Sequence, residues 1–208
     1  MWGLIENNEI KKIINKPKGL VIGDTRHSRN IFSFRWTNAE REAIGIYEVV
    51  FDNSNKRDEN FYNNTNQSFN FADGKVTASF GTATAKLLED RNEVDEAGEP
   101  LLDDKGNQIV TKGLKSQKKA IIKNQASGLL APTDWYVIKA TDVESYSVPS
   151  AVTTFRANVR TKSNEMETAI DNAADVDALA TLYQYVNTGT EENPVMERPL
   201  GEFPILEI

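Results

Sequence analysis

The 208-residue sequence contains no cysteine and a single histidine, His27. Without cysteine there is no disulfide framework, no thiolate nucleophile and no zinc–sulfur site, which fits a protein that folds in a reducing cytosol. A Ser-His-Asp triad would need that one imidazole, and no G-x-S-x-G sequence surrounds any serine. His27 lies in the polar stretch GDTRHSRN, so we interpret it as a surface loop residue rather than a general base.

Phosphate-binding and metal-binding motifs are also missing. The sequence has neither a Walker A motif nor a G-x-G-x-x-G loop. The stretches DRNEVD and DDKGN supply oxygen ligands, but neither has the EF-hand order of glycine and glutamate. We therefore expect no cofactor and no metal. Carboxylates are plentiful, so the inventory leaves the paired-acid chemistry of glycosidases open.

No apolar run approaches the roughly 20 residues that a membrane-spanning helix needs, so we expect no membrane insertion. The formal charge of −7 is unevenly distributed. Residues 89–108 hold eight acids and two bases, whereas residues 109–123 hold five lysines and no acid. A basic patch of this size suggests nucleic acid. However, the acidic neighbour offsets it and no aromatic residues alternate with the lysines, so we expect no nucleic-acid partner and interpret a solvated lysine face.

The first part of the chain is predicted to be rich in β-structure. Asn7-Asn8 suits a tight turn between two apolar runs, and NIFSFRW alternates like a strand, with Phe32, Phe34 and Trp36 on one face. TNAEREAIG has the marks of a short helix, with a capping box of Thr37 and Glu40 and a C-terminal Gly45. IYEVVF then reads as a strand.

Two hairpins are predicted next. An asparagine-rich polar connection over residues 52–68, around Phe61 and Tyr62, leads into SFNFADGKVTASF, which has a turn at Asp73-Gly74. A protruding acidic hairpin is expected over about residues 89–112, with turns at Ala97-Gly98 and Lys105-Gly106. We recognise no internal repeat.

The second part of the chain is predicted to be helical. Apolar residues fall at helical spacing from Leu114 to Leu130, while WYVI reads as a short strand. Pro149 suits the first turn of a helix, Asp175 caps another, and the proline-broken tail is apolar enough to pack as an extended arm. One apolar stripe follows Pro149: Val152, Phe155, Val159, Met166 and Ile170. The fold class is α+β, with a β-rich module over 1–112, a helical module over 113–187 and an arm over 188–208.

Four polar or aromatic residues in this second part are candidates for a role in binding. Trp135 follows Asp134, and we interpret the indole as an anchor between the predicted strand and the helices, with Asp134 capping or pairing locally. Arg156 and Arg160 are four residues apart and share one helix face. They either pair with acids on a neighbouring segment or hold a partner subunit.

The stretch DWYVIKATDV…VPSAVTTFRANVR resembles the D-W-x-x-x-(K/R)…P…(Y/F)-R-x-x-(V/L)-R segment of tailed-bacteriophage proteins described as tail assembly chaperones or tail-fibre-associated proteins. WTNAEREAIGIYEV, NQSFNFADGKVTAS and RPLGEFPILE are similar to a group of marine phage proteins of about this length. The likeness to that group spans nearly the whole chain. The segment ending at Arg160 is the part shared more widely.

This resemblance implies a non-catalytic structural protein of the phage virion, associated with the tail, tail fibre or baseplate. The implied partners are other tail or fibre proteins, with several copies in a symmetric assembly, and the implied location is the virion tail after synthesis in the host cytoplasm. Matching positions for partner contacts are Asp134, Trp135, Arg156 and Arg160, with Trp36 and Tyr47 from the N-terminal likeness.

Two alternatives remain open from the sequence. The first is a transient tail or tail-fibre assembly chaperone that is absent from the mature particle. The second is a host-surface carbohydrate-binding module or hydrolase, for which Trp2, Trp36 and Trp135 would offer stacking planes. Burial of the indoles distinguishes this second alternative, because a buried ring offers no platform.

Overall fold

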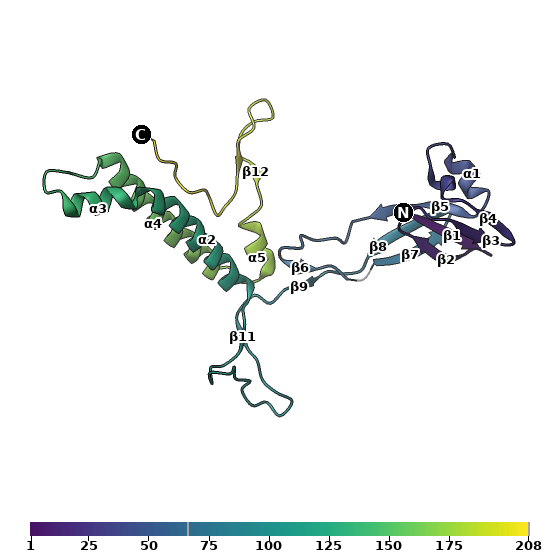
Figure 1. Ribbon diagram of the computed structural model, residues 1–208, viewed down its shortest axis with the longest axis horizontal. Coiled ribbons are helices and arrows are strands. Elements are labelled where there is room, and N and C mark those ends of the chain that lie inside the picture. The colour runs from purple at the N-terminus through teal and green to yellow at the C-terminus, as the bar shows by residue number, and fades with distance from the viewer. Residues whose placement is uncertain (66, 208) are drawn as a thin grey trace. The chain divides into compact units, whose positions relative to one another are not determined.

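The computed structural model describes residues 1–65 and 67–207, and the chain divides into two compact units, Met1–Thr84 and Ala85–Ile208. Unit 1 is built on a curled β-sheet and unit 2 on helices, which confirms the α+β class (Figure 1). The sequence-based division placed residues 89–112 in the N-terminal module. The structure instead groups them with the helical unit.

The central sheet of unit 1 has five strands in the order β2-β1-β5-β8-β7. Strands β5 and β8 pair in parallel, and the other pairs are antiparallel. The edge strands β2 and β7 approach each other, so the sheet curls. The strand bounds are β1 (Trp2–Glu6), β2 (Glu9–Ile14), β5 (Ile46–Asp52), β7 (Gln67–Ala72) and β8 (Lys75–Phe80).

Side chains of successive strand residues point to opposite sides of this sheet, and each side carries its own core. Leu4 and Ile46 belong to one buried cluster, whereas Ile5 and Val49 belong to the other. Val76 lies so close to Gly3 that a Cβ there would be 2.9 Å from its side chain. The sheet is therefore packed on both faces.

Short elements connect the first strands. These are β3 (Leu20–Ile22), β4 (Thr25–His27), the 3₁₀ helix η1 (Arg29–Phe32) and α1 (Asn38–Glu42). The prediction that NIFSFRW is a strand is wrong. The Ser28 hydroxyl accepts from the Asn30 backbone N–H and begins the 3₁₀ turn, and Phe34 is 95% exposed. Local side-chain capping therefore overrides the alternating pattern.

The turn chemistry of unit 1 agrees with the sequence. Thr37 and Glu40 form the predicted capping box, and Gly45 has a φ of 79°. A Cβ at Gly45 would lie 2.6 Å from the Ile5 carbonyl oxygen, so this position requires glycine. The Asn7-Asn8 and Asp73-Gly74 turns take the predicted positive φ values.

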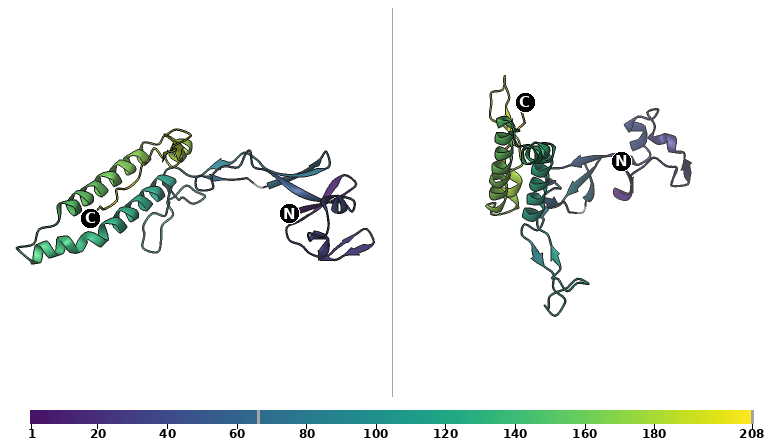
Figure 2. Two further views of the ribbon diagram at one scale, coloured as in Figure 1. Left: turned by 90° about the horizontal axis from the view of Figure 1, so that it is seen from above. Right: turned by 60° about the vertical axis from the view of Figure 1, so that its left-hand side comes forward.

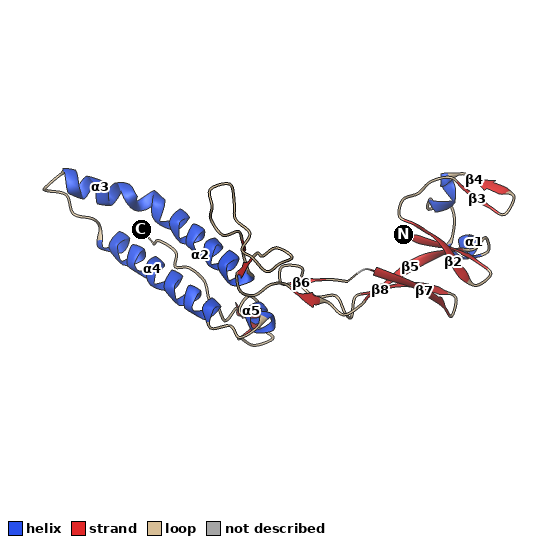
Figure 3. Ribbon diagram, turned by 90° about the horizontal axis from the view of Figure 1, so that it is seen from below, coloured by secondary structure: helices blue, strands red, loops and turns tan. Residues whose placement is uncertain are grey.

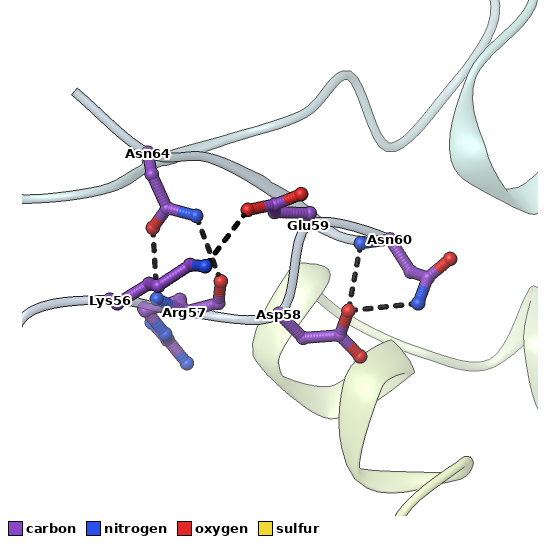
Figure 4. A network of polar contacts seen from close by, with 6 residues as sticks. All are labelled: Lys56, Arg57, Asp58, Glu59, Asn60 and Asn64. Atoms are coloured by element: carbon purple, nitrogen blue, oxygen red, sulfur yellow. Dashed lines mark hydrogen bonds and ion pairs between the residues drawn. The ribbon is translucent and has the colours of Figure 1, made fainter. Parts of the chain in front are cut away.

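The asparagine-rich connection folds back on itself through side-chain amides (Figure 4). Asn64 accepts from the Arg57 backbone N–H at 2.9 Å and donates to the Arg57 carbonyl at 3.0 Å, so its side chain pairs as a backbone peptide would. Asp58 accepts from the Asn60 backbone and side-chain N–H groups, both at 2.8 Å. Tyr62 is buried and begins β6 (Tyr62–Asn63), which pairs with β9 (Thr84–Ala85).

The acidic hairpin of residues 89–112 begins unit 2, and we call it the double-turn hairpin. Strands β10 (Arg91–Asn92) and β11 (Val110–Thr111) form its base. Two turns follow the same hydrogen-bond pattern eight residues apart. The Asp95 carboxylate accepts from the backbone of Ala97 and Glu99, and the Asp103 carboxylate accepts from Lys105 and Asn107. DEAGE and DDKGN therefore form the same local turn.

Two long antiparallel helices form the body of unit 2 (Figure 3). The helix bounds are α2 (Leu114–Leu130), η2 (Ala131–Thr133), α3 (Asp134–Asp142), α4 (Ser150–Asp171) and α5 (Val176–Thr181). The predicted stripe of α4 is confirmed, since all five of its apolar residues are buried. Asp175 caps α5 through the Ala178 N–H at 2.7 Å, also as predicted.

WYVI is part of α3, so the predicted strand is wrong. Its β-branched and aromatic residues lie in a helix whose first turn carries Asp134 and whose last turn carries Lys139. Both charges suit a helix in this direction. None of the residues in α3 is buried.

The end of the C-terminal arm, residues 198–207, packs on the helix pair as predicted, whereas residues 188–197 belong to an exposed hairpin. After β12 (Val186–Asn187) and β13 (Met196–Glu197), the chain returns alongside the helices (Figure 2). Leu200 is buried, and Phe203 and Leu206 pack against the cluster of Ala126, Phe155 and Val159. Ile208 lies outside the described residues. The arm therefore completes the core of unit 2.

Candidate functional site

The corner between α2 and α3 brings together three of the residues singled out in the sequence. Helix α2 ends at Leu130, a single 3₁₀ turn containing Pro132 follows, and Asp134 begins α3. The Thr133 hydroxyl donates to the Leu130 carbonyl at 2.7 Å. This short corner places Asp134 opposite α4, where Arg156 lies.

The Arg156 guanidinium holds this corner to α4. Its Nη1 atom lies 2.7 Å from the Asp134 carboxylate, 3.0 Å from the Leu130 carbonyl oxygen and 2.5 Å from the Thr133 hydroxyl. The Arg156 side chain is 12% exposed and Thr133 is 2% exposed. A charged donor thus satisfies one of the carbonyl groups that the end of α2 leaves without an intrahelical partner. The expected pairing of Arg156 with a neighbouring acid is confirmed.

Arg160 lies one turn further along α4 and has a different environment. Its guanidinium donates to the Arg156 carbonyl at 3.2 Å. The side chain is exposed, and within the described part of the chain no carboxylate forms an ion pair with it. Arg160 is therefore a cation without a described carboxylate partner. Its neighbour Arg156, in contrast, is paired with Asp134.

These residues line an open groove of about 470 Å³ between α2 and α4, which we call the α2–α4 groove. Ala126 and Leu130 contribute apolar atoms to it, and Ser127, Ser163 and Asn164 contribute polar ones. Its charged residues are Lys123, Asp134, Arg156 and Arg160. Lys123 is paired with Glu167 at 3.3 Å. The groove is thus polar and apolar in equal parts, with more basic than acidic side chains along it.

The groove lies on one side of the helix pair and the C-terminal arm lies on the other. On α4, Arg160 and Asn164 line the groove, whereas Asn158 and Lys162 line a hollow shared with Glu202 of the arm. On α2, Gln125 and Leu129 face the arm through Phe203. Each helix therefore has one face covered by the arm and one face open.

Trp135 does not anchor the fold, so that interpretation is wrong. Its side chain is 50% exposed, on a helix that buries nothing, and its ring stacks at 3.8 Å on that of Tyr136. The neighbouring Val137 and Ile138 are exposed as well. The outer surface of α3 is consequently apolar and uncovered within the described chain.

Trp36 and Tyr47 belong to unit 1, and each packs against one of its two buried clusters. Trp36 packs against the cluster of Leu4 and Ile46, and its ring lies edge-on to His27 at 6.5 Å. Tyr47 packs against the other cluster, with its ring 4.8 Å from that of Phe71. Both rings are partly buried in this packing, so they support the sheet.

The exposure of the indoles bears on the carbohydrate-binding alternative. Trp2 stacks on Phe32 at 4.6 Å and packs, like Trp36, against a core cluster of unit 1. Trp135 alone of the three is exposed by half, and the acid beside it is engaged by Arg156. His27 lies in strand β4 and is partly buried, which corrects its assignment to a loop.

The lysine-rich stretch is not a free solvated face. Four of its lysines form ion pairs: Lys112 with Asp90, Lys115 with Glu89, Lys119 with Asp171 and Lys123 with Glu167. Lys118 lies over the Tyr183 ring at 5.1 Å. Two of the acids come from the base of the double-turn hairpin, so the acidic and basic stretches partly neutralise each other there.

Asp90 fixes that hairpin to the start of α2. Its carboxylate lies 2.7 Å from the Lys112 amine and accepts from the Gly113 backbone N–H at 2.9 Å. The hydrogen bond to Lys112, together with those to Ser116 and Gly113, lowers the pKa of Asp90 from 3.8 to about 2. The Glu89 carbonyl passes so near Gly113 that a Cβ there would lie 2.3 Å away, so this junction requires glycine.

Among residues 1–65 and 67–207, no group of three or more His, Asp or Glu side chains is arranged to hold a metal ion. In the same part of the chain, no helix is both long enough and apolar enough to cross a membrane. No protein-family model, curated protein or solved structure matches the chain.

Sequence reasoning missed two parts of this site. Thr133 and the Leu130 carbonyl share the Arg156 guanidinium, and no side-chain pattern signals a backbone acceptor. The spacing of Pro132 after a predicted helix was the available signal, since proline favours the first turn of a new helix. The groove itself depends on which face the arm covers, which the sequence does not specify.

Proposed function

We propose that this chain is a non-catalytic structural protein of a tailed-phage virion, associated with the tail, tail fibre or baseplate. It acts through contacts with other virion proteins. The resemblance of its sequence to tail-associated phage proteins supports this proposal, and so does the amount of surface that the chain leaves uncovered.

The exposed area is the observation that carries the proposal. The chain exposes 14118 Å². A compact 23.3 kDa globule would expose about 9,700 Å², and two separate globules the size of units 1 and 2 would expose about 11,700 Å² together. About 2,400 Å² is thus in excess of two separate folded monomers. A standard interface covers about 800 Å² on each partner, so the excess suits several neighbours.

The residues that create this excess have the composition of contact surfaces. Val94, Leu101 and Leu102 are exposed on the double-turn hairpin, and Trp135 and Ile138 are exposed on α3. Neither element has a core of its own. Exposed apolar side chains on elements that bury nothing are expected where a second protein supplies the missing contacts.

Mass spectrometry of purified virions tests the proposal. The chain is expected in particles at a fixed stoichiometry relative to the tail proteins, and it should stay there through a high-salt wash. Presence in infected-cell lysate but absence from particles would contradict the structural role and favour the transient chaperone.

A further inference from the structure

We infer that the α2–α4 groove receives the double-turn hairpin of a second copy of this chain, so that copies associate head to tail. This inference rests on the proposed function, because it names one of the partners that a multi-copy virion protein would have.

The two surfaces are complementary in charge. Residues 89–108 carry a formal charge of −6, and Glu96, Glu99 and Asp104 are exposed at the two turns. The groove presents the Arg160 guanidinium, for which no described carboxylate serves as partner. An acid from a second copy would supply that partner with little rearrangement, because Arg160 already lies along the rim of the groove.

They are also complementary in their apolar content. Val94, Leu101, Leu102 and Ile109 lie on the hairpin between and beside its two turns, and each is at least 40% exposed. The groove offers the partly buried Leu130, beside Ala126, which is 7% exposed and belongs to the core of unit 2. Apolar contacts in the middle with opposite charges around them are typical of protein interfaces.

The hairpin is shaped in advance of any contact. Asp95 and Asp103 each hold two backbone N–H groups, and the Gln108 amide bridges the Glu93 and Leu101 carbonyl oxygens at 2.7 and 3.1 Å. A preformed element loses less conformational freedom on binding than a flexible loop does. This accounts for ordered turns in a segment that has no core.

A hairpin does not occupy the groove of its own chain. Asp90 fixes it at Gly113, the residue that precedes α2, and none of its residues lines the groove. The groove begins ten residues further on at Lys123, which is about 15 Å along the helix axis. Figure 1 shows the hairpin leaving the helix pair at the end where α2 begins. The hairpin and the groove of one copy are therefore both free for different neighbours, which produces a ring or a filament.

Sedimentation velocity on the full chain over a concentration series provides the test. One variant reverses charge on the hairpin, Glu96→Lys with Asp104→Lys, because neither side chain bonds its turn within the described chain. The other reverses charge in the groove, Arg160→Glu. Each is expected to weaken self-association by about tenfold or more. The matched control, Glu191→Lys with Glu192→Lys, changes charge by the same amount in the arm and should associate like the unmodified chain.

Mixing the two defective variants tests whether the hairpin and the groove meet each other. The intact hairpin of the Arg160→Glu chain meets the intact groove of the hairpin variant, and the reversed hairpin meets the reversed groove with opposite charges again, so the mixture is expected to recover association beyond a 1:1 complex. A mixture that stops at a 1:1 complex would indicate a symmetric dimer and contradict head-to-tail association. An unmodified chain that stays monomeric, variants that associate normally, or a mixture that stays monomeric would each overturn the inference. A chain that stays monomeric in solution and yet is found in virions overturns this inference and leaves the proposed function standing.

Discussion

Two hairpins of this protein each turn at glycines with positive φ and differ in what lies beneath them. In unit 1, Asp73-Gly74 joins β7 and β8, whose residues Val76 and Ala78 are completely buried. In unit 2, the two turns of the double-turn hairpin are closed by Asp95 and Asp103, and the segment between them buries nothing. The first hairpin is stabilised by packing, the second by side-chain hydrogen bonds to the backbone. The first hairpin is therefore part of a buried core, whereas the second leaves its apolar side chains exposed.

Removing a buried side chain from the sheet should have the largest effect. Ile46 is 0% exposed at the start of β5, and Ile46→Ala is expected to lower the free energy of unfolding of unit 1 by about 2–5 kcal/mol. Urea denaturation followed by hydrogen exchange within unit 1 measures this. Leu102→Ala on the double-turn hairpin is the matched control, because Leu102 is 56% exposed, and its effect should stay within about 0.5 kcal/mol. Equal effects at the two positions would remove the distinction.

A buried polar contact in unit 2 should rank second. Arg156→Met leaves the Leu130 carbonyl and the Thr133 hydroxyl without their charged donor, so unit 2 is expected to lose about 1.5–3 kcal/mol. Arg160→Met is the control, because the exposed guanidinium makes a single contact to the Arg156 carbonyl. Hydrogen exchange in α2 and α4 against urea concentration separates the two. A loss as large for Arg160 as for Arg156 would contradict the assignment of Arg156 as the residue that holds the corner.

Removal of a turn carboxylate should act locally. Asp103→Ala deletes two bonds to backbone N–H groups, at 2.9 and 2.8 Å, and the loss should be about 1 kcal/mol, as for a helix cap. Amide exchange should accelerate over residues 103–107 and stay unchanged in β7 and β8. Asp104→Ala, one residue along, should leave both regions unchanged. Faster exchange in the sheet would show that the hairpin stability depends on more than its own turns.

The mildest change is expected on lowering the pH. The pKa of Asp90 is lowered to about 2 in the folded chain, so its contribution is fully present above its ordinary pKa of 3.8 and is lost as the pH falls toward 2. The Gly113 amide resonance should therefore move between about pH 4 and pH 2, with the double-turn hairpin loosening at its base. Asp90→Asn removes the charge and should abolish that dependence. A midpoint near 3.8 in the unmodified chain would contradict the described geometry.

The sequence predicted those elements whose signals are local. The capping box of Thr37 and Glu40, the glycine at 45 and the stripe of α4 follow from spacing alone, and each is present. Trp135 shows the limit of such signals. Its β-prone neighbours belong to a helix because the preceding turn and the terminal charges favour one, and no residue pattern shows that the helix remains uncovered.

The sequence predicted that residues of the candidate site form charge pairs, but it did not predict which groups they contact. Arg156 and Asp134 were recognised as partners for some charge, and the structure pairs them with each other. Their third neighbour is a backbone carbonyl, which any sequence contains at every position. The order of the strands in the sheet could not be predicted either, because pairing between strands far apart in the sequence depends on the packing of the whole unit.

The parallel pairing of β5 with β8 has a consequence for how the chain is made. Val49 lies opposite Val76. During synthesis, β5 therefore lacks its second neighbouring strand, β8, until the asparagine-rich connection and β7 have been made. Contacts between such distant residues form slowly, because closing the intervening segment costs entropy first. During that delay β5 is an unprotected edge that can pair with other nascent chains. A polypeptide truncated after Gly74 should therefore aggregate, whereas one that extends through Phe80 should stay dispersed.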